Sequence, residues 1–358
     1  MAKGRTIICF FLIISSFTFL SGQQYSFSIA AFDGLLIPHN YSVLYLNSQG
    51  VRAINAEFSS SLYKNSLYSN IYRNPEAGIG FFASNLGKNS ILGNSFSGYS
   101  FFYAPLIRRK YKFIPGWKIA IGYTHITKLY DMNSNYRNIA IGTHGNVYFN
   151  IGLDLRYNIN AKTSIYASYG ITHFSNGNIK KPNLGVNVAG TSVGCRWSFF
   201  SQPLPASKDS ISLKRYSKSI TFVGGARSYN MFYNSPYPSF SLVGDVYRQF
   251  NPKRKWGLGF DVFYSQAFKP ILVYKGYGNV EFFDKVQAGV HGGYALCYNK
   301  LSLIIHMGYY VYAKYKEKPI YSRYGLRYAI TDKILLNFSL KAHLGVADYV
   351  EYGIGYAF

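Results

Sequence analysis

Apolar and polar residues alternate along much of this chain, and this period of two constrains the fold more than any other feature. The clearest runs are residues 146–157, 256–265 and 334–344. Alternate side chains of a β-strand face opposite sides, so each run predicts a strand with one apolar face. The runs are about ten residues or longer, the length that a tilted strand needs to cross a bilayer. The sequence therefore predicts an all-β protein whose strands can span a membrane.

The residues between the apolar positions are small or polar, and four of them are charged: Asp154, Arg156, Asp261 and Lys341. Such side chains suit the wet lumen of a membrane barrel better than a packed soluble core. The last run, DYVEYGIGYAF, resembles the C-terminal strand of bacterial outer-membrane barrels. We therefore expect a transmembrane antiparallel outer-membrane β-barrel.

Strand-like runs follow one another from residue 145 to the end, separated alternately by short turns and longer connections. Four more runs lie upstream, at residues 51–62, 76–84, 95–105 and 117–128, and their pairing is not evident. A closed single-chain barrel needs an even number of strands, and we expect about fourteen, with twelve or sixteen possible. No connection is long enough and rich enough in Pro and Gly to demand two domains, so residues 23–358 are expected to form a single barrel.

The first 22 residues combine a basic start at Lys3 and Arg5, an apolar run and a small-residue end at Ser21 and Gly22. This order is typical of a secretory signal peptide, which we expect to be removed. The net charge of +24 favours an anionic partner. Export favours an anionic membrane surface over nucleic acid as that partner. We therefore expect no nucleic-acid ligand, and no sequence feature indicates an oligomeric state.

One segment, THFSNGNIKKPNLGVN at residues 172–187, carries polar side chains where the strand pattern calls for apolar ones. His173 and Ser175 continue the apolar face of one strand, and Asn187 is in phase with the apolar face of the next. All three are therefore expected to face lipid near a strand end. Two interpretations stay open. In the first, the three residues are ordinary polar residues at the membrane interface. In the second, Ser175 is a nucleophile, His173 is its general base and Asn187 orients the imidazole.

The same segment resembles the active-site segment of the PagL family, the outer-membrane lipid A deacylases also called acyloxyacyl hydrolases. Its His-x-Ser-Asn element, followed by Pro182, Asn183 and Gly185, carries the resemblance. The stretches NPEAGIGFFASNLG, SFFYAPLIRRK and NIAIGTHGNVYFNIGLDLRYNI add to it. The resemblance covers roughly residues 36–200. It implies a β-barrel ester hydrolase of the Gram-negative outer membrane that removes an acyl chain from lipid A (lipopolysaccharide).

The resemblance also implies roles for individual residues. Ser175 would be the nucleophile and His173 the base, with an oxyanion hole at the backbone N–H groups near Asn176 and Gly177. Better-known members of the family carry a glutamate where this chain has Asn187. An asparagine can orient the imidazole but cannot stabilise the imidazolium by charge, so this departure from the family's pattern indicates a Ser-His-Asn site that is slower or inactive.

Two lysines, Lys180 and Lys181, lie in the connection after His173 and Ser175. They either bind lipid A phosphates as charge partners or are ordinary solvated loop residues. No metal or other cofactor is expected, because the remaining histidines lack metal-ligand spacing. We expect those histidines to be lumen or interface residues.

Residues 217–358 contain no chemical motif and are expected to be additional barrel strands. A wide barrel could enclose a lumen, so the alternative to an ester hydrolase is a non-enzymatic barrel: a pore, or a lipopolysaccharide-binding or structural protein.

Overall fold

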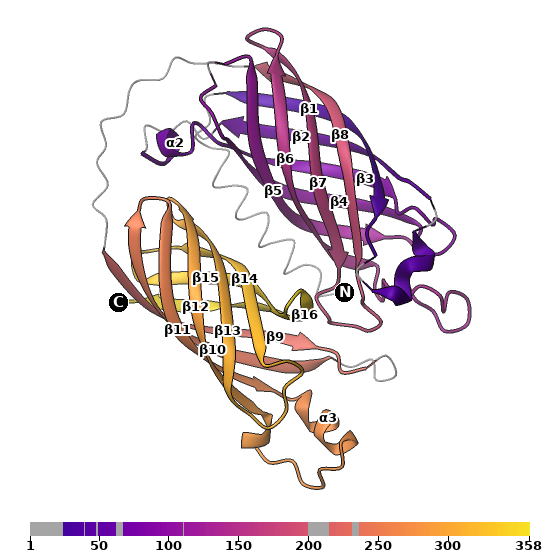
Figure 1. The fold of residues 1–358 in the computed structure, drawn as a ribbon, viewed down its shortest axis with the longest axis vertical. Helices are drawn as coiled ribbons and strands as arrows, with labels where there is room; N and C mark the ends of the chain where they lie inside the picture. The colour runs from indigo at the N-terminus through magenta and orange to yellow at the C-terminus, as the bar shows by residue number, and fades with distance from the viewer. Residues whose placement is uncertain are drawn as a thin grey trace. The chain divides into compact units, whose positions relative to one another are not determined.

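The computed structural model describes residues 24–38, 40–47, 49–61, 67–109, 111–199, 215–230 and 236–358. In these residues, antiparallel strands close into two separate barrels of eight strands each (Figure 1). The chain accordingly divides into two compact units. The expected signal peptide, residues 1–22, lies outside the described residues.

The first barrel uses eight consecutive strands, each paired with its neighbour in sequence. They are β1 (Tyr25–Leu36), β2 (Val51–Ser61), β3 (Glu76–Asn85), β4 (Asn94–Pro105), β5 (Phe113–Ile126), β6 (Gly145–Asn158), β7 (Thr163–Ser175) and β8 (Val186–Phe199). The ring closes where β8 pairs with β1, in a register that runs from Tyr25 opposite Phe199 to Leu36 opposite Val188. The short helices η1 (Tyr41–Leu46) and α2 (Leu67–Ile71) lie in connections.

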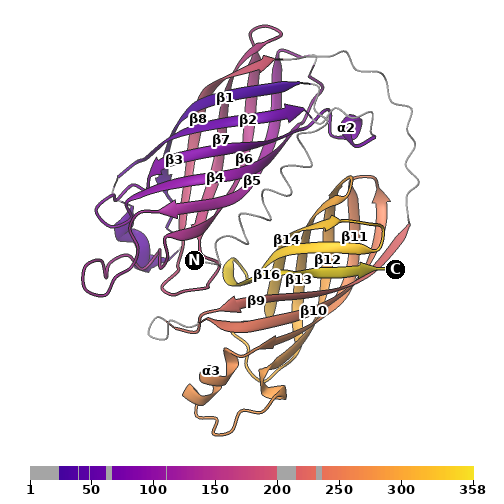
Figure 2. The same ribbon diagram turned by 180° about the vertical axis from the view of Figure 1, so that it is seen from behind.

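The second barrel repeats this plan, and both rings can be followed from behind in Figure 2. Its strands are β9 (Tyr216–Arg227), β10 (Tyr237–Asn251), β11 (Arg254–Ser265), β12 (Val286–Tyr298), β13 (Leu301–Ala313), β14 (Ile320–Ala329), β15 (Ile334–His343) and β16 (Val346–Ala357). Pairing of β16 with β9 closes the ring. The connection between β11 and β12 carries α3 (Phe268–Tyr274) and η2 (Phe283–Lys285).

The architecture differs from the single barrel of about fourteen strands that we expected, since sixteen strands form two rings. Alternation determines which way a side chain faces, but it does not determine which strand meets the free edge of β1. That edge is taken by β8, so the first ring closes before the segment 200–214, which lies outside the described residues. The strand β1 itself is absent from the expected set, although Phe27 and Ile29 on its outer face alternate with buried Ala30 and Phe32.

The predicted division into an apolar outer face and a polar inner face is confirmed in both barrels. Leu153 and Leu258 are 64% and 73% exposed on the outside. The charged residues Asp154, Arg156, Asp261 and Lys341 are buried inside. An outer face of exposed apolar side chains matches the hydrocarbon of a bilayer, and a polar interior is what membrane barrels enclose. No helix in the described part of the chain is long and apolar enough to cross a membrane.

Side chains fill the middle of both interiors, because eight strands leave an interior only wide enough for them. In the first barrel, Glu57 binds Lys118 at 2.6 Å, and a neighbouring cavity of about 30 Å³ has room for only a water molecule or two. In the second barrel, Arg323 joins Asp261 and Glu351, each at 2.6 Å. The wide lumen that a pore would need is therefore not present in the described barrels.

The shortest connection of the first barrel and most of the shortest connections of the second lie at one end of each barrel, which we call the short-turn end; residues 106–112 also lie at this end of the first barrel, and the short connection of residues 344–345 lies at the other end of the second. The connection of residues 159–162 in the first barrel, and those of residues 252–253, 299–300 and 330–333 in the second, lie at the short-turn end. In the first barrel the opposite end carries residues 127–144, between β5 and β6, and residues 176–185, between β7 and β8. The end of β7, with Ser175, therefore lies beside two long connections.

The outer face predicts a test of membrane exposure. We expect Leu258→Arg, near the middle of β11, to destabilise the second barrel by about 2–4 kcal/mol, because a charge on the lipid face near the midplane is poorly solvated. Tyr274→Arg in α3, where Tyr274 is 84% exposed, should change stability little. Urea unfolding in lipid vesicles measures both, followed by the fluorescence of Trp256 after Trp117 and Trp197 have been replaced by phenylalanine. Equal effects of the two substitutions would contradict the membrane-facing assignment.

Candidate active site

A chain of two hydrogen bonds joins His173 to Ser175 and Asn187. The imidazole Nδ1 lies 2.6 Å from Asn187 Oδ1, and Nε2 lies 2.9 Å from Ser175 Oγ. An amide oxygen only accepts, so Nδ1 carries the proton and donates it to Asn187. This leaves the Nε2 lone pair to accept the Ser175 hydroxyl proton. The imidazole therefore has the tautomer that a general base needs.

The strands β7 and β8 produce this arrangement through their register. His173 lies directly opposite Asn187, and Ser175 follows His173 by two residues on the same face. Phe174, between them, is fully buried in the interior of the barrel. Because alternate residues face opposite sides, His173 and Ser175 lie on the outer wall with the exposed residues Tyr169 and Ile171.

Gly185 packs against this pair and tolerates no side chain. A Cβ added to Gly185 would lie 2.9 Å from His173 Cε1 and 3.4 Å from the Cβ of Ser175. Its φ of +78° is also a conformation that residues other than glycine rarely adopt. The Gly185 N–H donates to the carbonyl of Ala140 at 3.0 Å, so the connection of residues 127–144 helps to hold Gly185 beside the imidazole.

That connection is itself fixed by a buried amide. Asn138 Nδ2 donates to the carbonyls of Ile91 and Lys128, both at 3.1 Å. Asn138 Oδ1 accepts from the N–H of Ile141 at 3.2 Å. Sequence reasoning did not identify Asn138 or Ala140 as supports of the site, because their partners lie far away along the chain.

The expected oxyanion and substrate-binding residues are arranged differently from the Ser-His-Asn chain. The backbone N–H of Asn176 donates to Asn183 Oδ1 at 3.0 Å, so this donor is engaged within its own connection. It would have to exchange that bond before it could stabilise an oxyanion. Gly177 has a φ of +65°, which glycine tolerates. The hydrogen bonds of the Ser-His-Asn chain do not include Lys180 or Lys181, which lie in the same connection.

Two further histidines lie on the same outer wall. His125, at the end of β5, is opposite Gly145, and Val147 of β6 is opposite Ser175, so His125 shares the face of Ser175. The His125 and His144 rings stack with centroids 5.1 Å apart, and both side chains are exposed. Only strand pairing brings these histidines near the site, so their positions in the sequence do not indicate that they lie on the face of Ser175.

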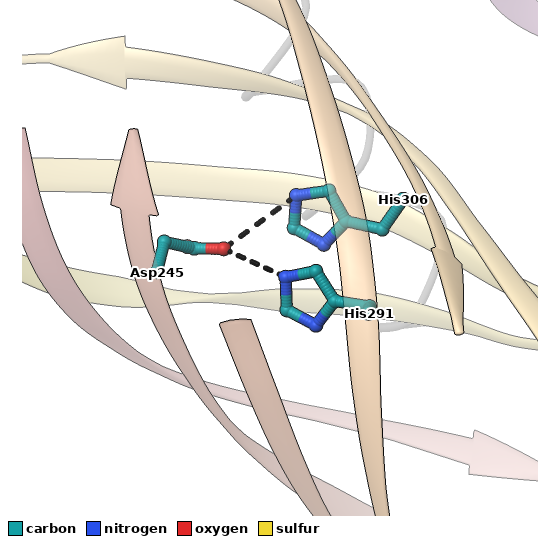
Figure 3. Close-up of side chains that lie close together, drawn as sticks. All are labelled: Asp245, His291 and His306. Carbon is teal, nitrogen blue, oxygen red and sulfur yellow. Dashed lines mark hydrogen bonds and ion pairs between the residues drawn. The ribbon is translucent and has the colours of Figure 1, made fainter. Parts of the chain in front are cut away.

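A second cluster, inside the second barrel, consists of Asp245, His291 and His306 (Figure 3). Asp245 Oδ1 lies 3.0 Å from His291 Nε2 and 3.7 Å from His306 Nε2. The two rings are stacked 4.2 Å apart and within 7° of parallel, so their lone pairs run side by side and do not converge on a metal. Tyr247 also binds His306 Nε2 at 2.8 Å, and Arg327 binds Asp245 at 2.8 Å. We interpret the cluster as part of the lumen's polar network.

The fold defines the class of this protein: it is a transmembrane β-barrel protein of the outer-membrane type. Family models then give the particular family. Residues 39–196 match the model described as "Lipid A 3-O-deacylase (PagL)", and residues 216–358 match "Acyloxyacyl hydrolase, C-terminal domain". The chain belongs to the PagL family of lipid A deacylases, as the resemblance predicted.

The match of residues 216–358 extends the family beyond residues 36–200, which is the part of the chain that the resemblance covers. Its model is named for the same class of hydrolase as the first, and its bounds coincide with the second barrel. The two family models therefore divide the chain where the two rings divide it.

Comparison with solved structures finds other barrels at low similarity. Neisserial surface protein A has 12% identity and a TM-score of 0.31, covering 49% of this chain and 97% of its own. The toluene transporter TodX of Pseudomonas putida has 11% identity and a TM-score of 0.19, covering 96% of this chain and 90% of its own. These scores are low, so the assignment of the fold rests on the strand pairing of this chain. A sequence comparison with curated proteins finds no match.

The contact at Gly185 predicts that a side chain there displaces the imidazole. We expect Gly185→Val to lower ester hydrolysis by about 10²-fold, because a misplacement of about 1 Å is enough for a loss of that size. Hydrolysis of a p-nitrophenyl ester by the purified protein in detergent measures the effect. Gly276→Val is the matched control, since Gly276 also has a positive φ but nothing lies near its Cβ position. Similar losses in both variants would show that backbone strain, and not the imidazole, is responsible.

Proposed function

We propose that this protein is an ester hydrolase of the Gram-negative outer membrane that removes an ester-linked fatty acyl chain from lipid A. The observation that supports this most is the Ser175–His173–Asn187 hydrogen-bond chain on the outer wall of the first barrel. The family to which the chain belongs is named for the same reaction. Short turns of outer-membrane barrels face the periplasm, so the end of β7 would face the outer leaflet, where lipid A lies.

The reaction would proceed through an acyl-enzyme. Ser175 Oγ attacks the ester carbonyl while His173 Nε2 accepts the hydroxyl proton. The tetrahedral intermediate collapses, the carbon–oxygen bond to the sugar breaks, and His173 returns the proton to the departing sugar hydroxyl. Water, activated by the same imidazole, then attacks the acyl-enzyme and releases the fatty acid. No step requires a metal or a redox cofactor.

The outward orientation of the site explains how such a substrate would reach it. The acyl chains of lipid A would lie along the exposed apolar wall that includes Tyr169 and Ile171. The phosphorylated sugars would lie at the rim, where Lys180, Lys181 and the exposed His125 offer positive or hydrogen-bonding groups. Lipid A would therefore present its ester to Ser175 without leaving the leaflet.

The nucleophile gives the most direct test. Ser175→Ala should lower release of fatty acid from purified lipopolysaccharide by at least about 10³-fold, because an alanine leaves nothing to form the acyl-enzyme. Mass spectrometry of the lipid A product measures this. Ser192→Ala in β8 is a matched control on the same barrel, and heat-dependent gel mobility checks that both variants are folded. Undiminished release by Ser175→Ala would refute the proposal.

The neutral orienting group predicts a gain of activity. We expect Asn187→Glu to raise kcat by about tenfold, because a carboxylate can still accept from Nδ1 and also stabilises the imidazolium that forms. We expect Asn187→Leu to lower kcat by about 10²-fold or more, since the imidazole then loses its orienting partner. Steady-state hydrolysis of a soluble ester by the three proteins measures both effects. A lower kcat for Asn187→Glu than for the unaltered protein would contradict the role given to Asn187.

A further inference from the structure

The first barrel contains a cavity of about 260 Å³ at its short-turn end, opposite to the end that carries Ser175. It is lined by the ends of β6, β7 and β8 and by the turn of residues 159–162. Three arginines, one lysine and one buried tyrosine face it: Arg109, Arg156, Arg196, Lys162 and Tyr103. The hydroxyl-bearing residues Ser164 and Ser198 also line the cavity.

The arginines converge on one buried carboxylate. Glu76 accepts from Arg109 at 2.7 Å, from Arg156 at 2.9 Å and from Arg196 at 2.7 Å. Three guanidinium groups on one carboxylate leave an excess of positive charge in a place of low solvent exposure. Such an excess is costly unless an anion compensates it.

The remaining charges near the cavity only partly offset this excess. Asp154 binds Arg156 at 3.0 Å, so Asp154 and Glu76 supply two negative charges. The three arginines and Lys162 supply four positive charges. The difference is an excess of two positive charges, which the two negative charges of a phosphate dianion would balance.

Tyr103 provides an independent sign of a ligand. Its side chain is 1% exposed, its ring lies 3.5 Å from the Arg156 guanidinium carbon, and its hydroxyl has no hydrogen-bond partner among the described residues. A buried hydroxyl is almost always paired, because leaving it unpaired is costly. An anion in the cavity would accept from Tyr103 and from the guanidinium groups at once.

We propose that this cavity is a binding site for a small phosphate-bearing anion, separate from the hydrolytic site. Arginine forks bind phosphate oxygens in a bidentate manner, and serine and tyrosine hydroxyls complete such sites. The ligand is a soluble phosphate compound and not a membrane lipid, because the cavity lies inside the barrel wall, where acyl chains held in the leaflet do not reach. With the short turns on the periplasmic side, the site takes its ligand from the periplasm.

Thermal unfolding of the full purified chain in detergent, with inorganic phosphate as the probe, tests the proposal. Phosphate should raise Tm in a saturable way beyond the effect of sodium chloride at equal ionic strength. Tyr103→Phe should weaken the apparent affinity for phosphate about tenfold while Tm in chloride alone is kept or raised. Lys162→Gln, at an exposed position, should weaken that affinity at least threefold without affecting folding.

Tyr166→Phe is the matched control, since it removes another buried tyrosine hydroxyl from the same barrel but does not line the cavity. It should leave the affinity for phosphate unchanged, and Tyr103→Phe should leave ester hydrolysis unchanged. The proposal is overturned if phosphate raises Tm no more than chloride does. It is also overturned if Tyr103→Phe and Tyr166→Phe respond to phosphate equally. Neither result depends on whether Ser175 hydrolyses esters.

Discussion

Closure of each sheet on itself is the constraint on which the rest of this structure depends. A hydrocarbon layer offers no partner to backbone N–H and C=O groups, so a sheet that crosses it cannot keep a free edge. Pairing of β8 with β1, and of β16 with β9, removes the edge from each barrel. Once a ring is closed, every second side chain must face lipid and the others must face the interior. The division into apolar wall and polar lumen follows from that geometry.

The same division gives the candidate site its unusual position. A soluble hydrolase places its nucleophile in a cleft, whereas the proposed nucleophile Ser175 lies on the lipid-facing side of the wall that exposes Tyr169 and Ile171, with only 7% of Ser175 itself exposed. The interior opposite them is closed by Phe174, which is fully buried. Under the proposed function, a substrate would approach Ser175 from the membrane side. This orientation suits an ester that is already embedded in a leaflet, and it makes a wide lumen unnecessary.

The sequence was sufficient to predict what depends on local periodicity. It predicted the strands of both barrels except β1, the inward orientation of Asp154 and Lys341, and the common face of His173, Ser175 and Asn187. It could not predict contacts that arise only when distant strands meet. Closure after eight strands, and the convergence of three arginines on Glu76, are of this kind. The bond from the Asn176 N–H to Asn183 was also missed, because it depends on the path of a connection and not on a strand pattern.

The amide at Asn187 reflects a conflict between the membrane and the chemistry. A carboxylate on the outer wall loses solvation near the hydrocarbon, whereas a neutral amide can remain there at lower cost. Asn187 Oδ1 still accepts a hydrogen bond from His173 Nδ1 at 2.6 Å, so it preserves the tautomer and the orientation of the imidazole ring. Unlike a carboxylate, Asn187 carries no negative charge that would stabilise the imidazolium while the acyl-enzyme forms. Under the proposed function, a hydrogen-bond chain with weaker electrostatic support would favour slow turnover over loss of the reaction.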